Sequence, residues 1–241
     1  RFYVLHCRLT AMSSSTPLAQ YASSLRSSGT GASLVLERIF PMFTVPVWIF
    51  LKMTDLQRHE ELLEAGLVCQ FDDSMGRALF VSHQWLGTHH PDPCFEQLRV
   101  LQKTLMDLIS GACRVSLPAV VELWFGRLRL PTARDFNGQG IFLWYDYFSV
   151  PQCEKSIQPR QMAISSIPSY ISQSFFFVIL IPAVQHEDGG ILSLETWAER
   201  GWCRLESMAR SLAREDGFMI TVKVASNPTL STDLGGLGKA P

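Results

Sequence analysis

Most of the side chains that could do chemistry lie in three short segments, residues 82–94, 143–154 and 197–206. The first segment contains imidazole, carboxylate and thiol groups, all of which can bind a metal ion. Their spacing matches no standard zinc pattern, so we expect no metal site and interpret the segment as a loop held in place by Trp85. Its candidates for ligand contact are Ser82, His83 and Trp85.

The second segment places a carboxylate directly after an apolar run. Asp146 follows aromatic and aliphatic residues, where a charge is costly unless it is solvated or paired. This carboxylate could contact a ligand or could stabilise a turn, and the sequence leaves both open. Glu154 is the nearest other carboxylate in the following loop, and by itself it does not identify a catalytic site. Tyr147 and Gln152 are further candidates for ligand contact.

The third segment combines large aromatic anchors with charged side chains. Arg200, Arg204 and Glu206 could form an ion-paired network where a packed helix begins, so we interpret the segment as structural or as an interface. A nucleophile–base pair of Cys203 and His186 would require the two to meet by accident of folding, and we do not favour it. Glycine-rich phosphate loops and the G-x-S-x-G elbow are absent. The structural or interface candidates are Trp197, Arg200, Trp202, Cys203 and Glu206.

Short apolar runs alternate with helical patterns from residue 78 onward, and these elements must position the three segments. Runs that are apolar on both faces and alternate with helices are typical of a parallel sheet covered by helices. We therefore predict an α/β fold, a three-layer sandwich with a mostly parallel sheet. The predicted strands are 78–82, 141–147, 175–181 and 218–224, and the predicted helices are roughly 93–110 (capped by Asp92), 115–130, 160–173 (which Pro168 must begin, kink or break) and 203–214.

The two ends of the chain are less regular, and the first residue is not methionine, so we expect a fragment of a longer protein. A helix is predicted after residue 54, with Thr54 or Asp55 as its N-cap and Gly66 at its end. The charge-free stretch Ile39–Leu51 would span only about 20 Å as a helix, against about 30 Å of hydrocarbon, so we expect no transmembrane segment. The predicted division is a poorly defined segment at 1–50, the α/β domain at 51–225 and a disordered tail at 226–241.

Composition limits the classes of partner. The chain has 241 residues, of which 47% are hydrophobic and 18% charged, and its net charge is -1. This hydrophobic content is typical of a folded protein, and the near-neutral charge provides no long-range attraction to nucleic acid or to an anionic membrane. None of the six cysteines forms a C-x-x-C pair, so we expect reduced thiols in a cytoplasmic protein.

Taken together, the motifs FVSHQW, LWYDYFSVPQ, IPSYISQSFFFVILIP and RGWCRLE resemble the Toll/interleukin-1-receptor-like (TIR) superfamily. The resemblance is to the branch that contains fungal heterokaryon-incompatibility domains and related protist proteins, and it covers about residues 78–215. It implies a flavodoxin-like sheet of about five parallel strands with helices on both faces. It also implies a role in signalling, in self/non-self recognition or in stress responses, often through self-association.

Individual positions carry this resemblance. Phe80–His83 resembles the serine-bearing box at the end of the family's first strand, and Asp146 resembles the aspartate that ends its second strand. In the same branch a Pro-Gln or Asn-Gln pair often follows, as Pro151 and Gln152 do here. The Trp-Cys…Glu box of plant TIR domains is similar to Trp202, Cys203 and Glu206.

The resemblance also bears on catalysis, because some TIR domains hydrolyse NAD at the nicotinamide–ribose bond with a glutamate on the helix after the second strand. That position falls near Ser166 here, and no acid lies between Lys155 and Gln185. An oxocarbenium-like transition state needs a carboxylate, and a serine cannot supply that charge. The sequence thus departs from the catalytic pattern at this position.

We therefore consider two functions. The first is a signalling module that associates with itself or with another signalling domain and holds a nucleotide at the sheet edge without cleaving it. The second is an NAD nucleosidase in which Glu154 supplies a relocated carboxylate. No cofactor is expected in either case, since NAD would be a ligand or a substrate. In the second case the pocket would gather Ser82, His83, Trp85, Asp146 and Glu154, with Trp85 or Tyr147 stacked on a base.

Overall fold

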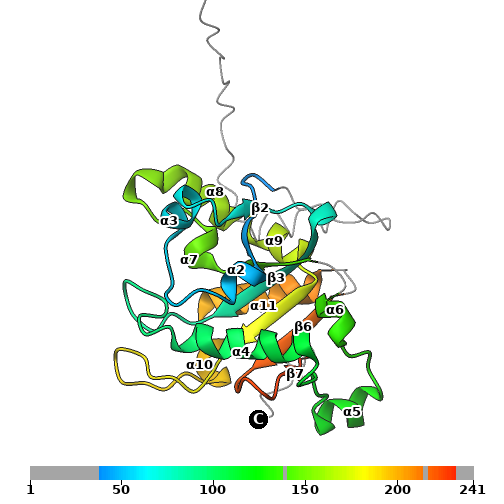
Figure 1. Cartoon of the computed structure of the whole chain (residues 1–241). Coiled ribbons are helices and arrows are strands. Elements are labelled where there is room, and N and C mark those ends of the chain that lie inside the picture. The colour runs from blue at the N-terminus through cyan, green and yellow to red at the C-terminus, as the bar shows by residue number, and fades with distance from the viewer. Residues whose placement is uncertain (1–37, 138–139, 214–216, 232–241) are drawn as a thin grey trace, which may run out of the picture. The chain divides into compact units, whose positions relative to one another are not determined.

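A mixed β-sheet organises the part of the chain that the structure describes, residues 38–137, 140–213 and 217–231 (Figure 1). In this computed structural model the sheet has seven strands in the order β2-β1-β4-β3-β5-β6-β7. The strands are β1 (Phe43–Pro46), β2 (Cys69–Gln70), β3 (Gly76–His83), β4 (Gly140–Trp144), β5 (Phe176–Leu180), β6 (Phe218–Val222) and β7 (Thr229–Leu230). The α-helices are α2 (Val47–Phe50), α3 (His59–Glu64), α4 (Glu96–Ser110), α5 (Ala119–Phe125), α6 (Ala133–Asn137), α7 (Asp146–Ser149), α8 (Ile157–Ser165), α9 (Ile167–Gln173), α10 (Leu194–Glu199) and α11 (Gly201–Leu212), and the 3-10 turns are η1 (Asp73–Met75) and η2 (Glu154–Ser156).

The four central strands, β4, β3, β5 and β6, run parallel to one another. All of β5 is buried, and the rings of Phe80, Trp144 and Phe177 stack across the three strands in the middle of the sheet. The chain passes from β3 to β4, crosses back past β3 to β5 and continues to β6, and these four parallel strands follow the order of the first four strands of a flavodoxin-like sheet. The predicted α/β fold with a mostly parallel sheet is confirmed, although the sheet has seven strands rather than about five.

Antiparallel strands at the two edges of the sheet account for this difference. β1 pairs with β2 and β4, and β7 pairs with β6. The stretch Ile39–Leu51 therefore belongs to the α/β unit, which begins before the predicted boundary at residue 51, and the predicted tail starts with a paired strand. Short edge strands are defined by their pairing partners more than by a local pattern, so the sequence did not reveal them. The rest of the predicted end segments, residues 1–37 and 232–241, lies outside the described residues.

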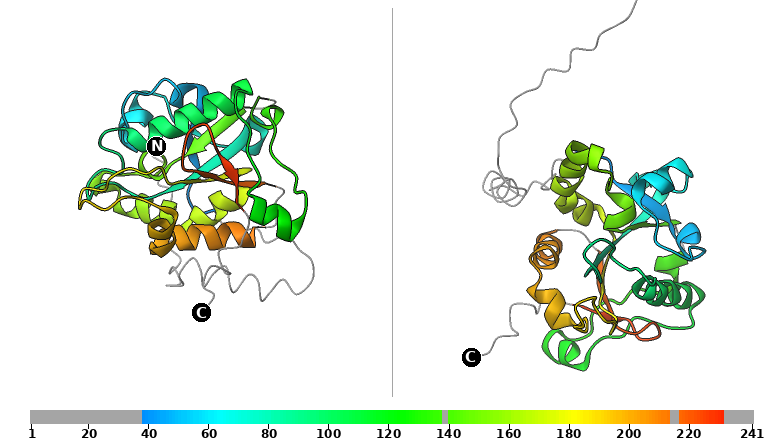
Figure 2. Two further views of the ribbon diagram at one scale, coloured as in Figure 1. Left: turned by 90° about the horizontal axis from the view of Figure 1, so that it is seen from below. Right: turned by 90° about the vertical axis from the view of Figure 1, so that its left-hand side faces the viewer.

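Helices cover both faces of the sheet, as the three-layer prediction requires (Figure 2). On one face, Leu98 and Leu101 of α4 pack in a core cluster with Val81 of β3. On the other face, α9, α10 and α11 pack in a second cluster around Phe80, and Cys203 of α11 belongs to it. Neighbouring residues of β3 thus point to opposite layers, because side chains alternate along a strand.

Some helices differ from their predicted bounds. α4 begins later than expected, at Glu96, whose backbone N–H donates to the Asp92 carboxylate at 2.8 Å. The predicted helix at 160–173 is divided into α8 and α9, and Pro168 lies in the first turn of α9, which is one of the predicted alternatives. The predicted helix at 115–130 is reduced to the seven residues of α5. The short helix α10 was not predicted.

The helix predicted after residue 54 is shorter than expected. It is α3, and its N-cap is Arg58 rather than Thr54 or Asp55. The Glu61 carboxylate accepts the backbone N–H of Arg58 at 3.0 Å and also pairs with the Arg58 guanidinium at 2.9 Å. These contacts between Glu61, in the first turn, and Arg58 explain why the helix begins directly after Arg58.

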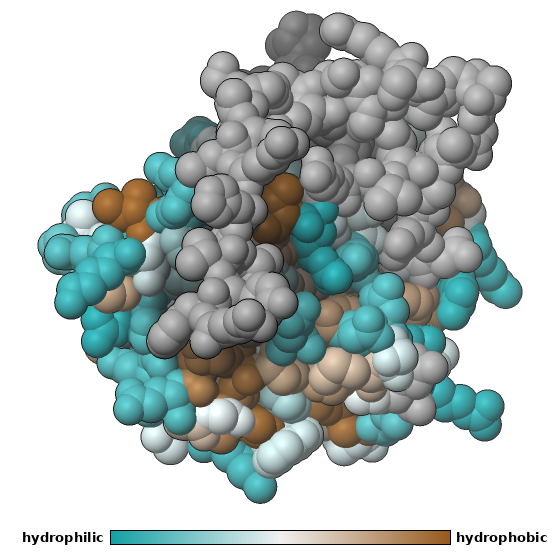
Figure 3. Space-filling view, turned by 90° about the horizontal axis from the view of Figure 1, so that it is seen from above, coloured by the Kyte–Doolittle hydropathy of each residue, from teal (hydrophilic) through white to brown (hydrophobic). Residues whose placement is uncertain are grey.

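No helix in the described ranges is both long enough and apolar enough to cross a bilayer. The stretch Ile39–Leu51, which carries no charge, forms β1 and α2 instead, and Phe50 at the end of α2 is fully buried. The face drawn in Figure 3 carries hydrophilic side chains interspersed with smaller apolar areas. Packing in the fold therefore accounts for the buried residues of this stretch, whereas Trp48 remains 62% exposed.

Candidate functional site

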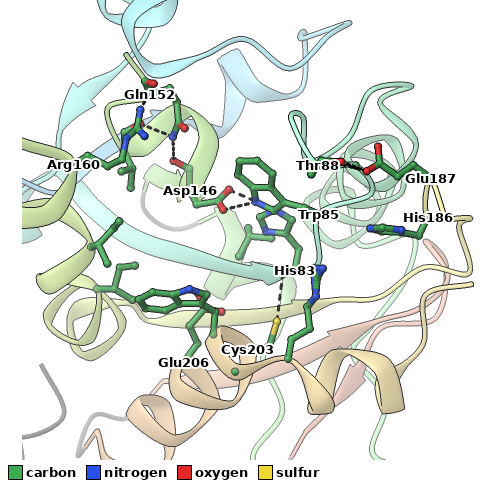
Figure 4. A pocket seen from close by; sticks show the side chains of 18 residues that line it. His83, Trp85, Thr88, Asp146, Gln152, Arg160, His186, Glu187, Cys203 and Glu206 are labelled. Atoms are coloured by element: carbon green, nitrogen blue, oxygen red, sulfur yellow. Dashed lines mark hydrogen bonds and ion pairs between the residues drawn. The ribbon is translucent and has the colours of Figure 1, made fainter. Parts of the chain in front are cut away.

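A cavity of about 820 Å³ lies at the carboxyl ends of the parallel strands (Figure 4). His83 ends β3, Asp146 begins α7 just after β4, and the loop after β5 contributes Glu187. This edge is where open α/β sheets bind ligands. Of the residues singled out in the sequence, those that line the cavity are His83, Trp85, Asp146, Gln152, His186, Arg200, Trp202, Cys203 and Glu206.

Three other predicted residues lie behind the cavity wall. Ser82 is fully buried and contacts an acidic side chain of α11 rather than the cavity. Tyr147 is only 8% exposed and packs edge-on against Trp85, so it is not placed to stack on the base of a ligand. Trp197 of α10 is buried in the second core cluster. These three side chains support the site from inside the protein.

The sequence indicated two positions for a catalytic carboxylate, Glu154 and the position that Ser166 occupies, and both lie outside the cavity. Glu154 is exposed in η2 and is not among the lining residues, so it is separated from the other candidates. Ser166 is fully buried, and its hydroxyl accepts the backbone N–H groups of Ile39 and Phe40 at 3.2 and 3.1 Å. The same hydroxyl donates to the Met162 carbonyl at 2.9 Å. Ser166 therefore holds the chain before β1 against α8.

Three carboxyl groups line the cavity, those of Asp146, Glu187 and Glu206, and Glu206 is the one that α11 contributes. The Ser82 hydroxyl donates to Glu206 Oε2 at 2.6 Å, and Trp197 Nε1–H donates to the Ser82 hydroxyl at 3.1 Å. An indole N–H can only donate, so the Ser82 oxygen accepts this bond and directs its own hydrogen to Glu206. The two hydrogen bonds run in one direction and orient the carboxyl group.

Enclosure by the protein raises the pKa of Glu206 to about 8. Burial of the carboxyl group is the main cause, and the negative charge of Asp146 adds to it, whereas the hydrogen bond from Ser82 lowers the pKa. The side chain of Glu206 is partly buried and lines the cavity. At pH 7 Glu206 is mostly protonated, and a positive charge in the cavity would favour its ionised form.

A second polar group in the cavity combines His83, Asp146 and Trp85. Asp146 Oδ2 accepts Trp85 Nε1–H at 2.7 Å, and Asp146 Oδ1 lies 3.4 Å from His83 Nε2 (Figure 4). The His83 ring stacks on Tyr145, with ring centroids 3.9 Å apart. Burial lowers the pKa of His83, although the charge of Asp146 opposes this shift, so the imidazole is neutral at pH 7.

Cys203 also lines the cavity, but its thiol is not activated. Burial, followed by the charge of Glu206, raises the pKa of Cys203 to about 12, and its Sγ donates to the His83 carbonyl at 3.5 Å. His186, the base considered with it, has Nδ1 2.8 Å from Asp188 Oδ1. A thiol with this pKa forms almost no thiolate at neutral pH, so the site does not favour a cysteine nucleophile.

The loop after α7 is held by residues of which only one was predicted. The Gln152 amide donates to the Val150 carbonyl at 2.8 Å, so this side chain maintains the loop. Arg160 Nε donates to the Pro151 carbonyl at 2.8 Å, and Glu60 accepts the backbone N–H of Gln152, also at 2.8 Å. Arg160 lines the cavity as well. No local signal distinguished Arg160 from the other polar residues of its helix.

Two further lining residues that the sequence did not reveal join the loops after β3 and β5. Glu187 accepts the Thr88 backbone N–H at 2.8 Å and also the Thr88 hydroxyl, and the Glu187 N–H donates to the Leu86 carbonyl at 2.8 Å. Gly87 passes so close that a Cβ there would lie 2.8 Å from the Glu187 carboxylate. Glu187 lies in an acidic loop that follows the buried strand β5. Its position after a predicted strand could have indicated from the sequence that it lies at the site.

Within the described part of the chain, no group of three or more His, Cys, Asp or Glu side chains is arranged to hold a metal ion. Comparisons of the chain with protein-family models, with curated proteins and with solved structures find no match. The similarity to TIR-like domains therefore depends on the sequence motifs, and the functional argument depends on the geometry of this cavity.

Proposed function

We propose that this protein hydrolyses the N-glycosidic bond between a ribose and a cationic nitrogen base, as in NAD. The observation that carries the proposal is the Glu206 carboxyl group, oriented by Ser82 at the wall of a cavity of about 820 Å³. The sequence motifs alone favour a non-catalytic module, because Ser166 is not an acid. Glu206 of α11 provides a carboxyl group at the cavity, so the lack of an acid at position 166 no longer argues against catalysis.

In the proposed reaction, the bond between C1′ of the ribose and the nicotinamide nitrogen breaks heterolytically. The electron pair stays with nicotinamide, which leaves as a neutral molecule, and the positive charge passes to C1′ and the ring oxygen of the ribose. Ionised Glu206 stabilises this cation, as carboxylates do in glycoside hydrolysis. A water molecule then bonds to C1′ and releases a proton, so the products are nicotinamide, ADP-ribose and a proton.

The pKa of Glu206 is compatible with this role. In the free protein the pKa is about 8, so most of the carboxyl group is protonated at neutral pH. A bound cationic nicotinamide ring favours the carboxylate, and the Ser82 hydrogen bond stabilises it further. The rate constant kcat/KM, which reports the free protein, is therefore expected to rise with pH through about 8.

The other cavity walls suit a nucleotide. Trp85 and Trp202 provide aromatic surface for a base, and Trp202 is 54% exposed. Arg160 and Arg200 provide cationic groups for a diphosphate. The volume of about 820 Å³ lies within the range of about 300 to 1,000 Å³ that is common for sites of small molecules and cofactors. The resemblance to TIR domains supports the same substrate.

The test is release of nicotinamide from NAD by the purified chain at high protein concentration. Glu206→Gln preserves the acceptor for Ser82, and we expect it to lower the rate at least about a hundredfold. Glu154→Gln is the matched control, because it makes the same chemical change at an exposed position outside the cavity, and it should leave the rate unchanged. No release by a folded protein, or equal rates for Glu206→Gln and the unaltered chain, would overturn the proposal.

A self-associating signalling module is the second candidate, and three exposed apolar side chains at the end of α5 favour it. Leu123, Trp124 and Phe125 are 84%, 70% and 52% exposed. Large apolar side chains grouped on a surface commonly mark a contact with another protein. We propose a second copy of the chain as the partner. Light scattering should then show assembly that increases with concentration and that Trp124→Ser weakens, whereas a strict monomer at high concentration contradicts this candidate.

The five cysteines in the described residues are free thiols, and Cys94 is exposed. Exposed free thiols persist most readily where glutathione and thioredoxin keep them reduced. We therefore propose a cytoplasmic location, which imaging of the tagged full-length protein would test.

A further inference from the structure

Two polar atoms in the cavity wall have no hydrogen-bond partner in the described structure, His83 Nε2 and Asp146 Oδ1. Both are buried atoms of residues that line the cavity, and they lie 3.4 Å apart. The His83 side chain is only 3% exposed. The great majority of buried polar atoms in proteins are paired, so two neighbouring unpaired atoms at a cavity wall indicate a missing partner.

The arrangement of hydrogens makes both atoms acceptors. A hydrogen bond with the Val81 backbone raises the pKa of His83, so its acceptor is the carbonyl, and we assign the ring hydrogen to Nδ1 because Nε2 makes no hydrogen bond. A neutral imidazole has one donor and one acceptor, so Nε2 presents a lone pair. The Asp146 carboxylate can only accept. Neither atom can satisfy the other, and both require a donor from outside the protein.

The two acceptors are held in place. Asp146 Oδ2 accepts the Trp85 indole N–H at 2.7 Å, which fixes the carboxylate. The His83 ring stacks on Tyr145 at an interplanar angle of 17°. A pair of acceptors fixed at this spacing selects a ligand with two adjacent donors. The vicinal hydroxyl groups of a ribose are such donors, and so is a primary amide.

We infer that His83 and Asp146 bind the vicinal hydroxyl groups of the ribose whose bond is cleaved. This inference rests on the proposed function, since Glu206 lines the same cavity and must approach C1′ of that ribose. The 2′-hydroxyl is borne by the carbon next to C1′, so holding the diol positions the scissile bond. His83 and Asp146 thereby select ribosyl over deoxyribosyl substrates.

The variant Asp146→Asn tests the pair with little change in shape. The Trp85 N–H needs an acceptor, so the Asn carbonyl oxygen takes that position and the amide N–H₂ faces His83 Nε2. The variant thus replaces two unpaired acceptors by a paired donor and acceptor. We expect it to remain folded and to lose the site for the diol.

Binding is measured by calorimetry in the Glu206→Gln background, where turnover is suppressed. The probes are NAD, its 2′-deoxy and 3′-deoxy analogues in the nicotinamide-bearing ribose, and nicotinamide alone. We expect NAD to bind roughly tenfold to a hundredfold more tightly than either deoxy analogue, the effect of one hydrogen bond to a charged or buried acceptor. Asp146→Asn should remove this preference. Asp72→Asn is the matched control, because Asp72 caps η1 outside the cavity, and it should preserve the preference.

The outcomes separate this inference from the proposed function. Equal binding of NAD and both deoxy analogues overturns the inference even if the unaltered chain releases nicotinamide. A preference for NAD that depends on Asp146, in a chain that releases no nicotinamide, supports the inference and overturns the proposed hydrolysis. Binding of nicotinamide alone that Asp146→Asn abolishes would assign the pair to the primary amide and overturn the assignment to the diol. The comparison of analogues needs no variant at Asp146, so poor folding of Asp146→Asn would not decide the result.

Discussion

The Ser82 hydroxyl lies 2.6 Å from the Glu206 carboxyl oxygen, although the two residues are 124 positions apart in the chain. Ser82 comes from β3 in the middle of the parallel sheet, and Glu206 comes from α11, the second helix between β5 and β6. Trp197 donates to the same hydroxyl and so directs the Ser82 hydrogen toward the carboxyl group. Burial raises the pKa of Glu206 while Ser82 lowers it, and this contact therefore helps to set the pH at which Glu206 ionises.

Ser82→Ala should move the pH profile of nicotinamide release to higher pH. Loss of the hydrogen bond raises the pKa of Glu206 above its value of about 8, so less carboxylate is present at neutral pH. A hydrogen bond to a charged group is worth about 1.5 to 3 kcal/mol, which corresponds to a decrease of about tenfold or more at pH 7. Rates between pH 6 and pH 10 check this, with Ser165→Ala as the control. An equal decrease at every pH would contradict this explanation.

Glu206 should also make stability depend on pH. Its pKa is about 8 in the folded protein, against an ordinary pKa of 4.5 for a solvated glutamate side chain, so the folded state retains the proton over this interval. The contribution of Glu206 to the free energy of unfolding is complete below about pH 4.5 and decreases as pH rises to about 8, at up to about 1.4 kcal/mol per pH unit.

Urea unfolding at several pH values tests this with Glu206→Gln, which cannot ionise. The stability of Glu206→Gln relative to the unaltered chain should increase between pH 4.5 and 8. For Glu154→Gln the corresponding difference should stay nearly constant, because Glu154 is exposed. A constant difference for Glu206→Gln would show that its carboxyl group is not enclosed.

The thiol of Cys203 should be unreactive even though it lines the cavity. Its pKa is about 12, so very little thiolate is available to an alkylating reagent at pH 8. Cys94 is exposed and should react first. Mass spectrometry after treatment with iodoacetamide distinguishes the two sites, and Cys203→Ala should still release nicotinamide. Rapid labelling of Cys203, or loss of activity in a folded Cys203→Ala chain, would restore the possibility of a cysteine nucleophile.

Ser166 should be important for stability and not for chemistry. Ser166→Ala leaves the partly buried N–H groups of Ile39 and Phe40 without their acceptor, at a cost of about 1 to 3 kcal/mol in the free energy of unfolding. Ser166→Glu places a charge at a fully buried position and should destabilise the fold further, without raising the rate of nicotinamide release. Ser165→Ala serves as the control in urea unfolding. A gain of activity in Ser166→Glu would contradict this assignment.

The sequence by itself determined the central architecture. The strands β3, β4, β5 and β6 are apolar runs with their own local signal, and the periodic pattern of α4 is equally local, so the α/β class and the parallel sheet were predictable. The carboxyl edge of that sheet followed from the strand directions, which is why His83, Trp85 and Asp146 were found before their geometry was known. Residues that follow successive parallel strands meet at one edge whatever the details of packing.

Only the tertiary structure decided that Glu206, and not Glu154, lines the cavity beside Asp146. The sequence pointed to Glu154, the acid nearest to Asp146 along the chain, and assigned Glu206 to an ion-paired network. In the fold, Glu154 is exposed. Glu206 accepts a hydrogen bond from Ser82, and burial raises its pKa. The state of a carboxyl group depends on the groups around it in space, and for Glu206 the partner in hydrogen bonding is 124 residues away. Local sequence patterns predict helices and strands, but hydrogen bonds between side chains far apart in the sequence form only when the chain folds.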